Sequence, residues 1–128
     1  MRTNKRVSAI VIKNDKLLLI HRFKNGNEYW VIPGGGVEDE ETLDEALVRE
    51  VKEETSLDLL SSEQVGSFEQ PEHQHYFFKC ILQKGEPSIG GPEKDNSAKD
   101  NVYILEWVPI SKVKTLTNLF PESIKEFL

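Results

Sequence analysis

Glutamates crowd the short run REVKEE, residues 49–54 of this 128-residue chain. Glu53 and Glu54 lie three and four residues after Glu50, so on a helix their carboxylates would be neighbours. Each like-charged pair would destabilise the helix by about 0.2–0.5 kcal/mol. Carboxylates near a helix C-terminus also oppose the helix dipole. Because Mg²⁺ prefers oxygen ligands, a bound ion would remove this repulsion, and the run is a candidate metal site.

The apolar pattern of the same segment supports an inward-facing position for two of these acids. Leu43, Ala46 and Leu47 form one helical stripe, and Glu50 and Glu54 continue it. A charge that faces the interior is costly unless it is paired or bound to metal. A solvated acidic face is nevertheless the usual fate of a charge run. The residue types alone leave these two interpretations about level.

The helix that must position these carboxylates has a clear start signal. Thr42 and Glu45 fit the S/T-x-x-E capping box, and we expect the helix to run from Thr42 to about Thr55. Arg49 lies four residues from both Glu45 and Glu53, which predicts ion pairs with each. One guanidinium group cannot neutralise the whole acidic cluster.

Strands are expected on both sides of this helix, because β-branched and apolar runs alternate with turn residues. Pro33 and the glycines that follow it are expected to end regular structure. The polar segment 84–101 has a length typical of a functional or disordered loop. The expected strands cover residues 6–12, 17–22, 29–32, 65–68, 75–82 and 102–108, and a short helix covers residues 121–128. Mixed strands with a central and a terminal helix predict an α/β sandwich.

Composition limits the classes of protein. A length of 128 residues suits one domain, residues 1–128. The net charge of −6 argues against binding a nucleic acid polymer. No apolar run is long enough to span a bilayer or to form a signal-peptide core, so we expect a cytoplasmic chain that starts directly with its first strand. Cys80 is the only cysteine and is expected to be a buried, inert thiol.

The segment 35–57 resembles the Nudix box, G-x5-E-x7-R-E-U-x-E-E-x-G-U, in which U is a bulky aliphatic residue. Gly35 matches the opening glycine and Glu41 the first acid. Ser56 departs from the pattern, which has glycine there; a non-glycine residue at a left-handed helix end costs on the order of 1 kcal/mol. The strand before PGGG and the late EWVPIS also resemble small members of this family. The other matching positions are Arg49, Glu50, Val51, Glu53, Glu54 and Leu57.

This resemblance implies the Nudix fold, an α/β/α sandwich with a mixed β-sheet, and hydrolysis of a nucleoside diphosphate linked to a moiety X. It implies Mg²⁺ or Mn²⁺ as the cofactor and water attack on phosphorus. Glu53 would act as the base and Arg49 would brace the glutamates. The ligands and nearby groups implied for the metal are Glu50, Glu53, Glu54, Gly35 and, from the long loop, Glu93.

The expected partner is a small nucleotide. A nucleoside triphosphate, including an oxidised one, is the first choice, because the chain is minimal and lacks a domain for a larger X. Dinucleoside polyphosphates, nucleotide sugars and ADP-ribose stay open. The alternative function is a non-catalytic Nudix-like module that binds a nucleotide and regulates a partner. The oligomeric state is not predicted.

Several further residues are candidates for substrate binding. Arg22 follows the second expected strand and could meet a phosphate or form a surface ion pair. Either Tyr29 or Trp30, with Trp30 our choice, could stack on a nucleobase, although packing is the commoner fate of strand aromatics. Glycines allow a ligand to approach the backbone closely. Those that would shape the substrate loop are Gly34, Gly35 and Gly36.

Two histidines and one asparagine complete the candidates. His73 and His75 would share a strand face, and we expect them to be surface residues rather than metal ligands. Asn118 lies where some family members read a purine edge; its default is an exposed turn residue.

Overall fold

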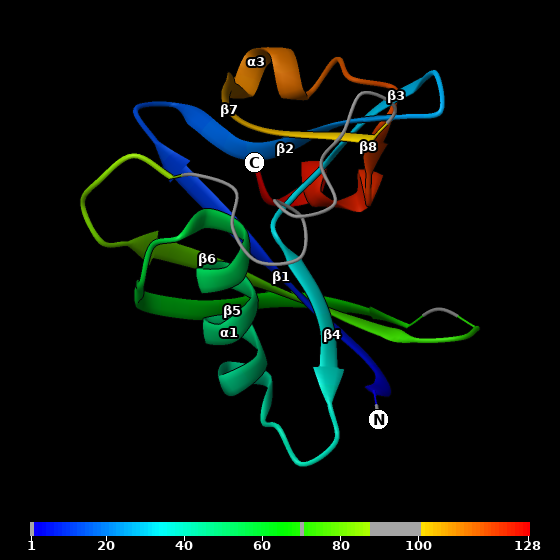
Figure 1. Ribbon diagram of the computed structural model, residues 1–128, viewed down its shortest axis with the longest axis vertical. Helices are drawn as coiled ribbons and strands as arrows, with labels where there is room; N and C mark the ends of the chain where they lie inside the picture. The colour runs from blue at the N-terminus through cyan, green and yellow to red at the C-terminus, as the bar shows by residue number, and fades with distance from the viewer. Residues whose placement is uncertain (1, 70, 88–100) are drawn as a thin grey trace.

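The computed structural model describes residues 2–69, 71–87 and 101–128 (Figure 1). The strands are β1 (Arg2–Lys13), β2 (Lys16–Lys24), β3 (Asn27–Val31), β4 (Gly34–Glu38), β5 (Leu59–Glu69), β6 (Gln74–Leu82), β7 (Asn101–Pro109) and β8 (Leu119–Phe120). The helices are α1 (Leu43–Thr55), α3 (Ile110–Val113) and the 3-10 helix η1 (Glu122–Phe127). Within these residues, no helix has the length and apolar character needed to cross a membrane.

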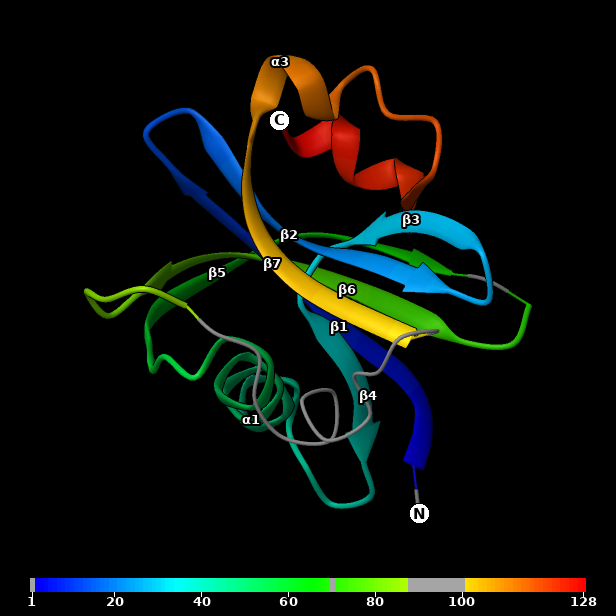
Figure 2. The same cartoon turned by 45° about the horizontal axis from the view of Figure 1, so that its top comes forward.

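The strands form one mixed sheet in the order β5-β6-β1-β2-β3-β8, with β4 paired to β1 and β7 paired to β2. The β1–β6 and β3–β8 pairs are parallel, and the others are antiparallel. Helix α1 lies on one side of the strands, and α3 and η1 lie on the other (Figure 2). The prediction of an α/β class with a mixed sheet between helical layers is confirmed.

Two apolar clusters hold these layers together. Ala9 and Val11 pack with Leu47 of α1, whereas Ile10 between them packs with Ile124 of η1. Successive side chains of a strand point to opposite faces, so β1 serves both clusters. The sheet is therefore buried between α1 and the C-terminal helices.

One expectation about the backbone was wrong. Pro33 and the glycines were expected to end regular structure, but Gly34–Glu38 forms β4 and pairs with β1, with Gly34 opposite Ser8. Pairing with a buried neighbour overrides the low strand propensity of glycine. A side chain at Gly34 would meet the Val7 carbonyl oxygen, since a Cβ built there lies 2.2 Å from it. This strand sets the glycine backbone directly beside the end of α1.

The short elements near the C-terminus were not foreseen in detail. The sequence predicted a helix over residues 121–128, and the structure has the 3-10 helix Glu122–Phe127 there. Helix α3 and strand β8 were missed, because segments of four and two residues carry no readable periodicity.

Helix α1 begins and ends as its local sequence indicates. Thr42 and Glu45 form the predicted capping box, which satisfies backbone N–H groups at the start. The helix ends at Ser56, whose backbone is left-handed with φ 66° and ψ 8°. The departure from glycine at this position therefore leaves the helix end in place.

Ser56→Gly is expected to raise the free energy of unfolding by about 1 kcal/mol, because glycine adopts the left-handed conformation without steric cost. Thermal or urea unfolding measures the change. Ser61→Gly, at an exposed strand position of β5, is the control and is expected to lower stability. A Ser56→Gly protein no more stable than the parent would show that the serine side chain compensates for the strain.

Candidate functional site

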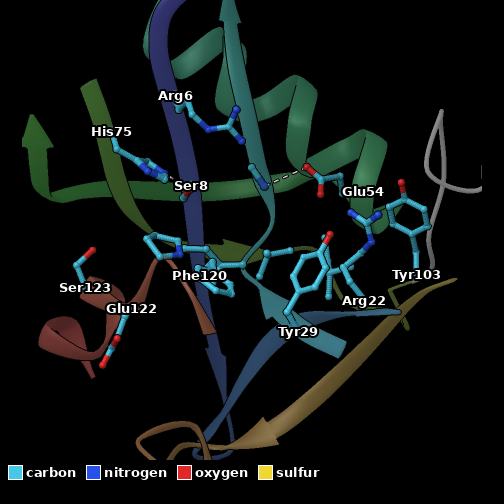
Figure 3. A pocket seen from close by; sticks show the side chains of 15 residues that line it. Arg6, Ser8, Arg22, Tyr29, Glu54, His75, Tyr103, Phe120, Glu122 and Ser123 are labelled. Atoms are coloured by element: carbon cyan, nitrogen blue, oxygen red, sulfur yellow. Dashed lines mark hydrogen bonds between the residues drawn. The ribbon is translucent and has the colours of Figure 1, made fainter. Parts of the chain in front are cut away.

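A cleft of about 680 Å³ opens between the two halves of the sheet. Arg6 and His75, from β1 and β6, line one wall, and Arg22 and Tyr103, from β2 and β7, line the other (Figure 3). Glu54, from the last turn of α1, lies between these walls. The cleft thus brings two arginines to a carboxylate of the acidic run.

The acids on the inner stripe of α1 are buried, as the apolar pattern predicted. Glu50 is 4% exposed and Glu54 is 5% exposed, whereas the Glu53 side chain is 38% exposed. The backbone N–H of Gly34 donates to Glu54 Oε1 over 3.0 Å. The Glu50 carboxylate fills the space beside Gly35, because a Cβ there would lie 2.5 Å from it. The interpretation as a solvated acidic face is therefore wrong for Glu50 and Glu54.

Arg49 holds these acids from the side. Its Nε and Nη2 donate to the two oxygens of Glu41 over 2.8 and 2.9 Å, a bidentate pair. Its Nη1 donates to Glu50 Oε1 over 2.9 Å and lies 3.7 Å from Glu53 Oε2. Nη2 also donates to the Gly36 carbonyl over 2.9 Å. The hydrogen bonds to Glu41 are the main cause that raises the pKa of Arg49 above its usual value.

The predicted pair between Arg49 and Glu45 was wrong. Glu45 accepts a hydrogen bond from the Thr42 backbone instead, as part of the capping box. The guanidinium turns toward β4 and Glu41, which helix spacing alone could not reveal.

The electrostatics of Glu50 fit a cation site. Burial raises the pKa of Glu50, and this is opposed first by hydrogen bonding and charge from Arg49 and also by the neighbouring Glu54 carboxyl group. Two neighbouring buried carboxylates are most stable when they share a proton or lie beside positive charge. Gly35 must be without a side chain here, because a Cβ would meet the Glu50 carboxylate. These oxygen donors fit a hard divalent ion.

Within the described ranges, no three His, Cys, Asp or Glu residues form a ready metal-binding group. Mg²⁺ is typically held by only one or two carboxylates, with water and substrate phosphates as its other ligands, so Glu50 and Glu54 meet the protein's share. Glu93, predicted from the resemblance, lies outside the described residues.

The predicted substrate residues divide into those at the cleft and those away from it. Arg22, Tyr29 and Gly34 line it. Trp30, our choice for stacking on a base, is 5% exposed and packs in the core against His21, with ring centroids 3.6 Å apart. Trp30 is not among the residues that line the cleft, so Tyr29 is the better placed of the two.

The expectation for His75 was wrong. His75 is 7% exposed, shares a hydrogen bond between its Nε2 and Ser8 Oγ, and lines the cleft. Burial, followed by the charges of Arg6 and His73, lowers the pKa of His75 to about 4. His75 lies two residues before the buried Phe77, so both side chains lie on the same face of the strand. This spacing was the signal available in the sequence.

Two other expectations were met. Cys80 is buried, and burial raises the pKa of its thiol to about 12, as expected for an inert cysteine. Asn118 donates to the Glu28 carbonyl over 2.9 Å and does not line the cleft, which agrees with its default as a turn residue.

Sequence reasoning missed the residues that pairing brings to the cleft. Arg6 lies opposite His75 across the parallel β1–β6 pair, and Tyr103 lies opposite Arg22 across β2–β7. These neighbours are far apart in the chain, so no local pattern marks them. Phe120 also lines the cleft, from β8.

Comparison with known proteins identifies the family of this chain. The profile of the NUDIX domain family matches residues 2–128. The chain is 50% identical over 52 residues to the ADP-ribose pyrophosphatase of Methanocaldococcus jannaschii, which covers 40% of this chain and 31% of that protein. It is 39% identical over 58 residues to the RNA pyrophosphohydrolase of a Marinomonas species, covering 45% and 36%. The chain thus spans about a third of the length of these relatives.

The fold is also similar to a solved structure of a NUDIX-family hydrolase from Clostridium perfringens. The TM-score is 0.73 at 20% identity, covering 99% of this chain and 94% of that one. At this identity the likeness supports the fold alone.

Acid is expected to destabilise the protein partly through His75. In the unfolded chain its imidazole takes up a proton near pH 6.5, whereas in the folded protein it stays neutral down to about pH 4. The unfolded state therefore binds more protons between these values, and the free energy of unfolding falls as the pH drops from 6.5 to 4.

Urea unfolding across this range tests the effect. His75→Gln is expected to lose less stability on acidification than the parent, and His73→Gln, the control, is expected to change the pH dependence less. Equal slopes in the parent and His75→Gln would contradict a buried neutral imidazole.

Proposed function

Because the chain belongs to the Nudix domain family, we propose that it is a pyrophosphohydrolase, dependent on Mg²⁺ or Mn²⁺, that cleaves a nucleoside diphosphate linked to a moiety X. The observation that carries this proposal is the burial of Glu50 and Glu54 on one face of α1, next to the backbone of Gly34 and Gly35. Because burial of two carboxylates on one helix face is costly, a divalent ion beside them would add positive charge to that of Arg49. The match over residues 2–128 supports a single domain over residues 1–128, which we place in the cytoplasm.

Each residue of the acidic run receives a role in this proposal. Glu50 and Glu54 would hold the ion, Gly35 leaves room for the Glu50 carboxylate, and Glu53 would be the more exposed acid of the site. A bound Mg²⁺ or Mn²⁺ supplies charge for the phosphate oxygens and lowers the pKa of a coordinated water. Glu53, the most exposed of the three, accepts the proton of the water that attacks phosphorus. Arg49, fixed by Glu41, keeps Glu50 and Glu53 in position.

The walls of the cleft suit a nucleotide. Arg6 and Arg22 line it from opposite sides and offer positive charge to phosphates. Tyr29 and Phe120, also in the lining, offer rings to a base. Our first choice of substrate is a nucleoside triphosphate, including an oxidised one, because both arginines lie near the carboxylate site. Gly34, Gly35 and Gly36 form the backbone along which the phosphates approach.

Glu53→Gln is expected to lower kcat by about 10²–10⁴-fold, because the amide cannot accept the proton from water. Fold and nucleotide affinity should be retained, since Glu53 is not buried. Turnover is measured with Mg²⁺ and Mn²⁺ on nucleoside triphosphates, dinucleoside polyphosphates, nucleotide sugars and ADP-ribose. Glu63→Gln, an exposed position on β5, is the control and should match the parent.

A parent protein that turns over none of these substrates but binds ADP would contradict the enzyme and support the non-catalytic nucleotide-binding module. A parent that is active while Glu53→Gln keeps full activity would move the base to another residue.

Addition of Mg²⁺ or Mn²⁺ is expected to raise the melting temperature, since an ion that binds only the folded state stabilises it by mass action. Differential scanning fluorimetry of the nucleotide-free protein measures the shift, which should disappear in Glu54→Gln. A shift of equal size in both proteins would place the binding ion elsewhere.

A further inference from the structure

The side chain of Arg22, on β2, projects between two tyrosine side chains. It is paired directly with Tyr29 of β3 on one side and with Tyr103 of β7 on the other. Residues directly opposite in antiparallel strands project to the same face of a sheet. The three side chains therefore rise together from one wall of the cleft, facing Glu54 (Figure 3).

The guanidinium group of Arg22 lies over both tyrosine rings, and Tyr103 is the nearer of the two. Arg22 Cζ lies 3.7 Å from the centroid of the Tyr103 ring and 5.5 Å from that of Tyr29. Both distances fall within the range of about 6 Å for cation–π attraction. The N–H donors of a guanidinium lie in its plane, and stacking of a ring over its face does not use them, so this arrangement is compatible with a planar, bidentate contact with phosphate.

Such stacking has a consequence for binding. A long flexible side chain loses rotamer freedom when it grips a ligand, and this loss weakens affinity. A side chain already held by its neighbours loses less, which strengthens the same contact. Arg6, on the opposite wall, is exposed, so the two arginines of the cleft differ in how firmly they are placed.

We propose that Tyr103, with Tyr29 as the second ring, is a positioning residue that holds Arg22 preformed for the phosphates of the substrate. This inference rests on the proposed function, since it names the group that prepares the same cleft for a nucleotide. Tyr103 acts through Arg22 and not on the base. Lysine cannot replace Arg22 in this role, because an ammonium group has neither the flat face nor the in-plane fork.

The test is a double-mutant cycle read by binding, without divalent ions so that turnover does not intervene. Calorimetry measures ADP affinity for the parent, Tyr103→Leu, Arg22→Ala and the double variant. Tyr103→Leu is expected to weaken ADP binding by about 10-fold. In the Arg22→Ala background the same change should have an effect of less than about 2-fold, because the residue through which Tyr103 acts is gone.

Two matched measurements separate this role from others. Tyr103→Phe keeps the ring and is expected to stay within about 2-fold of the parent. Adenosine, which has no phosphate, should bind the parent and Tyr103→Leu alike. If Tyr103→Leu does not fold, as judged by its melting temperature, Tyr103→Met and Tyr29→Leu take its place in the cycle.

The outcomes decide the proposal. If Tyr103→Leu weakens ADP binding as much in the Arg22→Ala background as in the parent, the proposal is overturned. It is also overturned if Tyr103→Leu weakens adenosine binding as much as ADP binding, because Tyr103 would then be a base-stacking residue. A parent that does not bind ADP at all would also overturn it. With an active parent, KM should rise for Tyr103→Leu at nearly constant kcat. If the parent binds ADP but shows no turnover, only the proposed activity is contradicted. The double-mutant cycle read by binding still tests the role of Tyr103.

Discussion

Two carboxylates are buried near the end of α1, and the rest of the site is arranged around them. Glu50 and Glu54 are 4% and 5% exposed, and burial of an uncompensated charge is unfavourable. Neighbouring groups accommodate these buried carboxylates: the Arg49–Glu41 pair, the backbone N–H of Gly34, and Gly35, which has no side chain. A divalent ion would add further positive charge beside these two carboxylates.

The two halves of the sheet turn this acidic end into a binding cleft. Arg6 and His75 stand on one wall, Arg22 and Tyr103 on the other, and Glu54 lies between them. The chain carries a net charge of −6, so this local positive charge is set in an acidic protein. Such a distribution favours a small phosphorylated ligand carried with cations over an extended polyanion.

Local signals in the sequence were enough for some of this arrangement. The capping box at Thr42 fixed the start of α1, and the apolar stripe predicted that Glu50 and Glu54 face inward. The remainder depends on pairing between distant segments, which local patterns do not encode. Strand β4 forms although its glycines have a low strand propensity. Arg49 pairs with Glu41 and not with Glu45, because β4 brings Glu41 close. The burial of His75 likewise follows from its place on a covered strand.

If the proposed function is right, a divalent ion binds against the carboxylates of Glu50 and Glu54. Crystals grown with Mn²⁺ test it most directly, because the anomalous signal of manganese locates the ion without reference to activity. A strong anomalous peak is expected within coordination distance of both carboxylates. A well-ordered site with no such peak, or manganese bound only at other acids, would contradict it.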